Sequence, residues 1–185
     1  NSENSEVGWF YPSSSATEID RYVIYNTQEQ VWYYGNLERH AWLDSGVENF
    51  PQATNNNYVY QHEIGYNDDG SAMTNVYVES SDFDIGDGNQ FSSISSIIPD
   101  IRFLQDDNSG TVNIVTKMRN YPGESLTTKA TSEISSSTTK ANVRARGRQA
   151  VVRFESNDDQ SGSGNVSLGW RVGATRFDVK TDGRR

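Results

Sequence analysis

The chain has 185 residues, of which 34% are hydrophobic and 11% aromatic, and its formal net charge at pH 7 is −9. This length holds one large or two small domains with a buried core, and the lack of cysteine excludes disulfide bonds and thiolate metal sites. The sequence contains no apolar run of about 18 residues, so it predicts no membrane span. It also contains no basic leader followed by an apolar core, so no secretory signal is visible in it.

The charge is divided unevenly along the chain. Residues 1–110 carry 18 acidic and 3 basic residues, a net charge of −15, whereas residues 111–185 carry 7 acidic and 13 basic residues, a net charge of +6. Such asymmetry is typical of separate interaction faces. The alternative is that the two halves neutralise each other in the fold, and the sequence leaves both interpretations open.

Short strands rich in aromatic residues are expected near the N-terminus. Residues 8–12 end on a proline, and residues 20–26 are joined by a polar turn to the aromatic run 31–35. Residues 58–66 alternate as a further strand. Because consecutive antiparallel strands are typical of a propeller blade or a meander, residues 1–70 are expected to form a propeller-like or meander piece. The chain is expected to be a fragment, or to have lost an N-terminal part, since it begins with Asn1 rather than methionine and does so within a strand-rich pattern.

The remaining residues, 71–185, are expected to form a C-terminal β-sandwich domain, with the boundary near residues 67–75. Alternating or apolar runs predict strands at residues 76–79, 91–98, 101–104, 111–119, 142–155 and 166–179. The Ser/Thr-rich segment 127–139 is either a long loop or an edge strand without large apolar side chains, which would promote association with other chains. No amphipathic helix of more than two turns is predicted. The expected fold class is therefore all-β, with a propeller-like or meander piece followed by a β-sandwich-like domain.

Three arginines occupy alternate positions in the predicted strand 142–155. Arg144, Arg146 and Arg148 should project from one face, and Arg153 from the other unless a bulge at Gly147 resets the register. Such a row is a candidate contact for a neighbouring subunit or for nucleic acid. A solvated or salt-bridged face is favoured, because no aromatic residues interleave the arginines as they do in proteins that bind single strands.

The loop 82–88, of sequence DFDIGDG, resembles a calcium loop, with Asp82, Asp84 and Asp87 as candidate ligands. Calcium-binding loops between helices also place an oxygen ligand at position 5 and a glutamate at position 12, where this chain has Gly86 and Ser93. A turn-rich loop between domains is therefore the preferred interpretation. No nucleophile motif and no phosphate-binding loop occurs, so neither an enzyme nor a cofactor is expected.

Several longer stretches resemble one family. They are residues 9–13 (WFYPS), 17–26 (TEIDRYVIYN), 31–35 (VWYYG), 41–43 (AWL), 60–63 (YQHE), 79–88 (ESSDFDIGDG), 143–149 (VRARGRQ), 169–173 (GWRVG) and 182–185 (DGRR). Together they are similar to the C-terminal part of tailed-phage virion structural proteins, particularly the tail nozzle or packaged-DNA stabilisation proteins of short-tailed phages. The resemblance covers nearly the whole chain except residues 1–6 and the Ser/Thr-rich segment.

This resemblance implies a β-propeller followed by a smaller β domain, so that residues 1–70 would be the last blade or blades of a propeller-like domain that is incomplete at its N-terminus, and the fold would be the terminal part of a β-propeller followed by a β-sandwich-like domain. It also implies assembly as a ring, commonly of six copies, around the DNA exit channel. The implied partners are other copies of the chain, tail proteins such as those on the adaptor or portal side and the tail fibre or needle, and the packaged double-stranded DNA. The implied location is the phage tail in the virion, and no catalytic residues are implied. We expect acidic residues of segment 1–110 to approach the channel, since like charge prevents DNA from adhering.

Two other functions remain open from the sequence. A host-receptor or carbohydrate-binding β module of the tail would present exposed tryptophans and tyrosines, whereas Trp9, Trp32, Trp42 and Trp170 are for the most part expected to be core residues. A glycan hydrolase would need two carboxylates that lie close together in the fold. Because the chain has 25 acidic residues, the presence of acids does not distinguish this hypothesis from the others.

Overall fold

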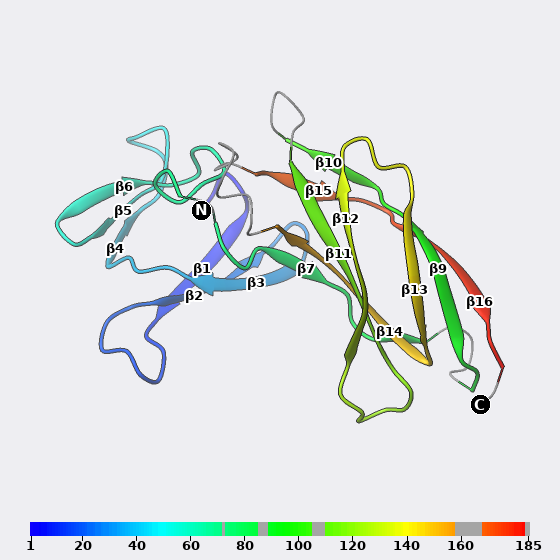
Figure 1. Ribbon diagram of the computed structural model, residues 1–185. Helices are drawn as coiled ribbons and strands as arrows, with labels where there is room; N and C mark the ends of the chain where they lie inside the picture. Colours follow the sequence, from blue (N-terminus) through cyan, green and yellow to red (C-terminus); the bar gives the residue numbers. More distant parts are fainter. Residues whose placement is uncertain (72, 85–88, 105–109, 158–167, 184–185) are drawn as a thin grey trace. The chain divides into compact units, whose positions relative to one another are not determined.

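The computed structural model describes residues 1–71, 73–84, 89–104, 110–157 and 168–183 (Figure 1). These residues form strands β1 to β16 and contain no helix, so the predicted all-β class is confirmed. The described part of the chain accordingly has no helix with the length and apolarity that a membrane-spanning segment requires. Two compact units divide the chain, unit 1 (Asn1–Gly65) and unit 2 (Tyr66–Arg185).

Unit 1 consists of two small antiparallel sheets. The first has the order β1-β2-β3, and the second has the order β4-β5-β6. Their strands are β1 (Glu6–Tyr11), β2 (Arg21–Asn26), β3 (Val31–Asn36), β4 (Ala41–Leu43), β5 (Gln52–Asn55) and β6 (Tyr58–Gln61). The first sheet is the three-stranded meander that the sequence predicts, and the second is a further meander. No closed propeller is formed by the described residues, and the propeller stays a prediction.

The hairpin turns of unit 1 follow from residues that tolerate or create turns. Asn26 accepts hydrogen bonds at its side-chain Oδ1 from the backbone N–H groups of Gln28 (3.0 Å) and Glu29 (2.8 Å), which closes the turn between β2 and β3. Asn56 and Asn57 both have positive φ, 47° and 66°. This conformation is the type I′ turn that joins the two strands of a tight hairpin, and asparagine adopts it at low cost.

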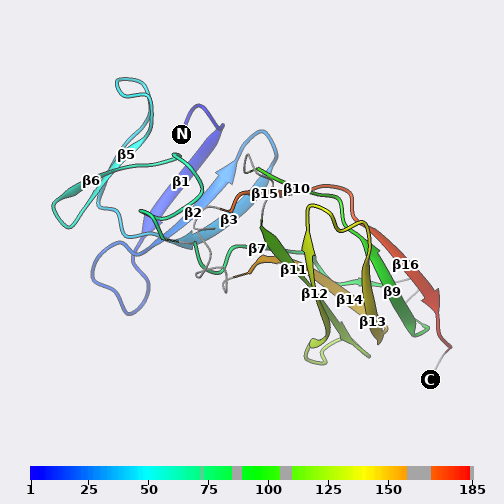
Figure 2. The same ribbon diagram turned by 45° about the horizontal axis from the view of Figure 1, so that its top comes forward.

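Unit 2 is built around two larger sheets. One has the order β12-β11-β14-β7, with β8 also paired to β14, and the other has the order β13-β9-β16. A two-stranded sheet pairs β10 with β15. The strands are β7 (Tyr77–Glu79), β8 (Phe83–Asp84), β9 (Ser92–Ile98), β10 (Ile101–Phe103), β11 (Thr111–Arg119), β12 (Thr127–Ser135), β13 (Ala141–Gly147), β14 (Gln149–Ser156), β15 (Trp170–Val172) and β16 (Arg176–Thr181). Figure 2 shows β9, β13 and β16 side by side.

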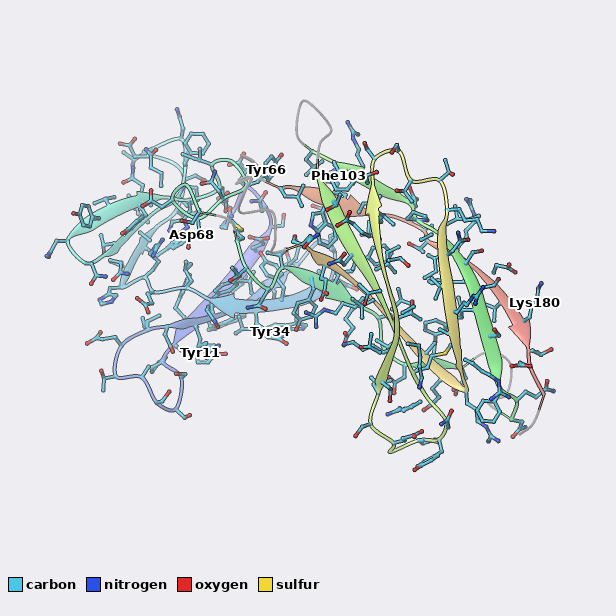
Figure 3. The ribbon with its side chains drawn as sticks, viewed as in Figure 1. Tyr11, Tyr34, Tyr66, Asp68, Phe103 and Lys180 are labelled. Carbon is cyan, nitrogen blue, oxygen red and sulfur yellow. The ribbon has the colours of Figure 1, made fainter. Side chains whose placement is uncertain are left out.

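A single apolar core holds the two large sheets of unit 2 together. Strands β11, β12 and β14 contribute Val112, Ile114, Met118, Ile134, Ala150, Val152 and Phe154, and strands β9 and β13 contribute Ile94, Ile97, Ala141, Val143 and Ala145. Phe103, labelled in Figure 3, belongs to the same cluster. Alternate residues of two facing sheets therefore share one buried layer, which is the arrangement of a β-sandwich.

Two long predicted strands are each two strands in the structure. Segment 142–155 ends one strand at Gly147 and begins the next at Gln149, and β13 and β14 lie in different sheets. A Cβ on Gly147 would lie 2.8 Å from Cβ of Met118 and 3.1 Å from the carbonyl oxygen of Arg119, so glycine permits the close approach at this crossing. The prediction that Arg144, Arg148 and Arg153 share one strand is therefore wrong. Residues 166–167 of the predicted strand 166–179 lie outside the described residues, and its described part separates into β15 and β16.

Three other elements refine the sequence expectations. Segment 127–135 is strand β12 at the edge of its sheet, so the edge-strand alternative is the correct one. Its Ser/Thr-rich composition keeps large apolar side chains off an edge that is open to pairing. Strands β4 and β5 were not predicted, because residues 41–43 and 52–55 are too short to show an alternating pattern.

Truncating the core of unit 2 should destabilise the chain strongly. Ile114 is fully buried, so Ile114→Ala is expected to lower the free energy of unfolding by about 2–5 kcal/mol. The matched control is Val78→Ala, on β7 of the same unit, whose side chain is 54% exposed and should change it by less than about 0.5 kcal/mol. Chemical denaturation followed by circular dichroism measures both, and equal effects of the two variants would contradict the shared core.

Candidate interaction surfaces

One face of the sheet β1-β2-β3 carries most of its aromatic side chains. Residues directly opposite each other in an antiparallel pair lie on the same face, and the pairing places Trp9 opposite Val23 and Val23 opposite Tyr34. Tyr25 is opposite both Val7 and Trp32. The same pairings place Arg21 and Asn36 beside Tyr11 at the end of this face. We define the aromatic face as its apolar and aromatic members, Val7, Trp9, Tyr11, Val23, Tyr25, Trp32 and Tyr34.

The aromatic face is open to solvent. Trp32 is 62% exposed, Tyr34 is 73% exposed, and Trp9 is 48% exposed. The rings of Trp9 and Trp32 stack with centroids 5.8 Å apart, and those of Tyr25 and Trp32 are 4.6 Å apart. Figure 3 labels Tyr11 on β1 and Tyr34 on β3. Contacts among the rings order this surface without covering it.

The opposite face of this sheet contacts the second sheet of unit 1. The rings of Phe10 and Trp42 have centroids 5.4 Å apart, and Trp42 lies 4.8 Å from the ring of His62. Ala53, opposite Trp42 on β5, is buried there. The two sheets therefore stack through these residues.

The remaining face of the second sheet points away from that contact. By the same pairing rule it carries Ala41, Leu43, Gln52, Thr54, Val59 and Gln61, which we call the outer face. Leu43 is 51% exposed, and none of the six residues is charged. Unit 1 is thus a stack of two sheets with an open surface on each side, and Arg21, at the end of the aromatic face, is the one charged residue on these two surfaces.

Unit 1 has almost no core of its own. Among its residues only Pro51 and Ala53 are buried. The expectation that the tryptophans are mostly core residues is therefore wrong for Trp9, Trp32 and Trp42, which are all exposed, whereas Trp170 is half-buried and donates a hydrogen bond from Nε1 to Ser156 Oγ (2.9 Å). Alternation was correctly recognised in the sequence, but it does not say which face of a strand is covered.

Most charged residues of unit 1 lie outside the strands, and the two that lie on strands are Glu6 and Arg21. Arg21, at the start of β2, donates a hydrogen bond to Asn36 and lies 3.7 Å from the carboxylate of Asp20. Asp20 accepts hydrogen bonds from the backbone N–H (2.6 Å) and the hydroxyl (2.7 Å) of Ser13, which lower the pKa of its carboxyl. These bonds close the connection between β1 and β2.

Glu6 lies at one end of the face of sheet β1-β2-β3 that contacts the second sheet, which we call the inner face. Tyr33 donates a hydrogen bond of 2.5 Å from its hydroxyl to Glu6, and burial together with this bond raises the pKa of Tyr33 well above its usual range. Burial, and then the neighbouring charge of Glu6, raise the pKa of Glu63. Among the described residues no group of three histidine or acidic side chains is arranged to hold a metal ion.

The predicted arginine row is only partly a row on one strand. Arg144 and Arg146 are exposed on β13, alternating with buried Val143 and Ala145 as predicted, but Arg148 follows the end of the strand. The guanidinium groups of Arg146 and Arg148 lie 4.2 Å and 5.0 Å from the ring centroid of Phe91. An aromatic side chain therefore does associate with the arginines, supplied by a distant segment that local sequence did not reveal.

Arg146 is also held by an acidic partner. It forms an ion pair with Asp182 and donates a hydrogen bond from Nη2 to the backbone carbonyl of Asp182 (3.1 Å). Arg146 and Arg148 thus contribute to the fold of unit 2, whereas Arg144 stays exposed on the surface of β13. Of the three predicted contact residues, Arg144 is the one best placed to meet another molecule.

The candidate calcium loop has a different structural role where it is described. Asp82 forms an ion pair with Arg119, and Asp84 ends strand β8, which pairs with β14. Asp87 lies outside the described residues. The carboxylate of Asp82 therefore pairs with the guanidinium of Arg119 in this structure. This ion pair accounts for the presence of Asp82 in the segment without a bound metal ion.

The two oppositely charged segments of the sequence meet within unit 2. Lys117 Nζ lies 2.5 Å from Glu79, and Arg153 Nη1 lies 3.9 Å from the same carboxylate. Each of these ion pairs, like that of Arg119, joins an acid before residue 110 to a base after it. Mutual neutralisation, one of the two alternatives for the charge asymmetry, thus occurs at these pairs.

A polar hollow on unit 2 is lined by Asn75, Val76, Asn113, Arg153, Glu155, Ser156 and Asn157. Arg153 Nε lies 2.7 Å from Glu155, and the Arg153 guanidinium stacks 3.7 Å from the ring centroid of Tyr77. Glycoside hydrolysis needs two carboxylates on either side of the substrate bond, and among the described residues that line the hollow the one carboxylate, that of Glu155, is tied to Arg153. The hollow does not provide that pair.

No protein-family model matches the sequence, and no curated protein is significantly similar to it.

The Asp20 contact predicts a pH-dependent contribution to stability. Because the folded pKa of Asp20 lies below its ordinary value of 3.8, this contribution is present above pH 3.8 and is lost as the pH falls through the folded pKa. Asp20→Asn should therefore lower stability at neutral pH and have little effect at the acid end. Unfolding curves across this pH range measure the difference, and a pH-independent effect would contradict the assignment.

Proposed function

We propose that this protein is a structural component of a phage virion, a tail nozzle or hub protein that forms a ring of six copies around the DNA exit channel and helps to retain packaged DNA. The resemblance of the sequence to such proteins supports this proposal. So does the all-β fold, which is the class that the resemblance implies. The protein would act without catalysis, through its surfaces.

The observation that carries the proposal is the lack of a core in unit 1. A unit of 65 residues normally buries a large part of its surface in order to be stable by itself, yet unit 1 buries only Pro51 and Ala53 while Trp9, Trp32 and Tyr34 stay exposed. Sheets of this kind are stabilised when neighbouring sheets stack on them, as in repeat proteins and propellers. Unit 1 therefore has the surface of a part that functions inside an assembly.

The charge of unit 1 suits a channel for DNA. It contains 9 acidic residues and 2 basic residues, Arg21 and Arg39. An acidic wall repels the phosphate backbone, so DNA passes without adhering, whereas a basic wall would bind it through counterion release. In this proposal the acidic residues of unit 1 approach the channel, and unit 2 contacts neighbouring copies or the tail proteins on either side.

A host-receptor or carbohydrate-binding module of the tail is the second candidate. The specific observation in its favour is the exposed pair Trp9 and Trp32, since flat aromatic surfaces bind other rings well. It is the weaker candidate, because a binding module that carries a ligand must first be stable by itself. The near absence of buried residues in unit 1 is evidence against such independence.

The decisive experiment is a cryo-EM reconstruction of whole phage particles with this chain traced into the density. A ring of identical copies around an axial channel at the tail is the expected result. A peripheral spike contacting host glycans would support the second candidate instead, and absence of the chain from the particle would overturn both.

A charge reversal at Arg144 tests the proposed contact of unit 2. Arg144→Glu should reduce the yield of assembled particles by about tenfold or more, because like charges brought together in an interface cost several kcal/mol. Lys129→Glu, on the exposed edge strand β12, is the matched control and should assemble normally. Normal assembly of the Arg144 variant with altered DNA retention would show that the residue contacts DNA rather than another protein.

A further inference from the structure

The two open faces of unit 1 are matched in chemistry. The aromatic face supplies large rings, and the outer face supplies the smaller side chains of Ala41, Leu43, Thr54 and Val59. Large side chains opposite small ones allow two sheets to interdigitate at the usual spacing of about 10 Å. Contact between the two faces would be unfavourable if either face carried an unpaired charge. The one charged residue on these faces, Arg21, forms an ion pair with Asp20 and donates a hydrogen bond to Asn36.

The location of the charges follows the anatomy of an interface. In unit 1 all acidic residues except Glu6 lie outside the strands, and Glu6 lies on the face of β1 that is opposite to the aromatic face. Protein interfaces have an apolar centre depleted of charge and a polar rim. Since the unit carries nine acidic residues in all, their exclusion from two sheet faces is a pattern that solvent-exposed faces do not require.

The exposed area is sufficient for a specific contact. An aromatic side chain has about 150–250 Å² of surface, so the exposed fractions of Trp9, Trp32 and Tyr34, with Val7 and Tyr11, leave on the order of 500 Å² on the aromatic face. This lies in the upper range for apolar patches on monomers, which are often functional. Covering it with the outer face and its rim buries about 1,000 Å² in total, near the lower limit for a specific interface.

We propose that the aromatic face of one copy docks on the outer face of a second copy of this chain. The contact joins two different surfaces, so it is heterologous, and such contacts generate rings where the rotation closes. The inference deepens the proposed assembly and rests on it for the closed ring, whereas the contact itself rests on the two faces alone. Nucleic acid is a poor occupant of the aromatic face, because the surrounding acidic residues repel phosphate.

Sedimentation velocity of the purified full chain over a concentration series tests this contact. The average size of the oligomers should increase with protein concentration.

Two variants test the two faces separately. Tyr34→Lys alters the aromatic face and Val59→Lys alters the outer face. Both side chains are largely exposed, 73% and 65%, so neither change should prevent folding. Each variant alone should associate at least about 30-fold more weakly, the effect of losing a central interface residue. Tyr121→Ser, an aromatic residue of unit 2 that is 60% exposed, is the control and should associate like the unaltered chain.

Mixing the two variants distinguishes a heterologous contact from a symmetric one. The Val59→Lys chain keeps an intact aromatic face and the Tyr34→Lys chain keeps an intact outer face, so an equimolar mixture should form a one-to-one dimer and stop there. If only Tyr34→Lys weakens association and mixing restores nothing, the contact is symmetric and the proposal is wrong. A chain that stays monomeric at all concentrations would also overturn the proposed contact, and a response of its tryptophan fluorescence to added glycans would then indicate ligand binding at the aromatic face instead. Neither result decides the proposed function, because the position of the chain in the particle is determined separately by cryo-EM.

Discussion

The covering of sheet faces is the constraint on which the organisation of this protein depends. A β-sheet has two faces, and at least one must be removed from water for the sheet to be stable. Unit 2 meets this requirement internally, because β9 and β13 face β11, β12 and β14 across a shared layer of buried aliphatic residues. Unit 1 meets it only between its two sheets, at the contact of Phe10 with Trp42 and around Ala53. The two units are therefore different kinds of object, one a self-contained sandwich and the other a stack with open ends.

This difference also explains how charge is used. In unit 2, acids and bases from distant segments form ion pairs, such as Lys117 with Glu79 and Arg119 with Asp82, so charge contributes to holding strands in register. In unit 1 bases are scarce, and acids such as Glu29 and Glu48 lie in connections where water solvates them. Exposed ion pairs contribute little stability, so the apolar faces, rather than the charges, decide whether unit 1 is ordered. A protein that assembles through unit 1 would be stabilised by its own assembly.

Much of this fold could be predicted from the sequence, and the failures have physical causes. Strands such as β2 and β11 were located because alternation over six to nine residues is a strong local signal. The crossing at Gly147 was missed because local alternation continues through it, and only the approach of Met118 and Arg119 from β11 shows why the chain changes sheet there. The contacts of Arg146 with Phe91 and Asp182 were missed for the same reason, since they join residues more than 30 positions apart.

The exposed tryptophans are the most informative failure. Sequence reasoning assigns large aromatic residues to a core because that is where most of them are, and the inference holds only when the chain contains enough partners to surround them. Trp9 and Trp32 lie on a face that unit 1 leaves open, so their environment is set by whatever the sheet contacts. A residue type that is normally buried, found ordered but uncovered on a flat sheet, indicates a missing surface rather than a misplaced side chain. The outer face of the same unit, uncharged and made of smaller side chains, is a surface of suitable chemistry that every further copy would bring with it.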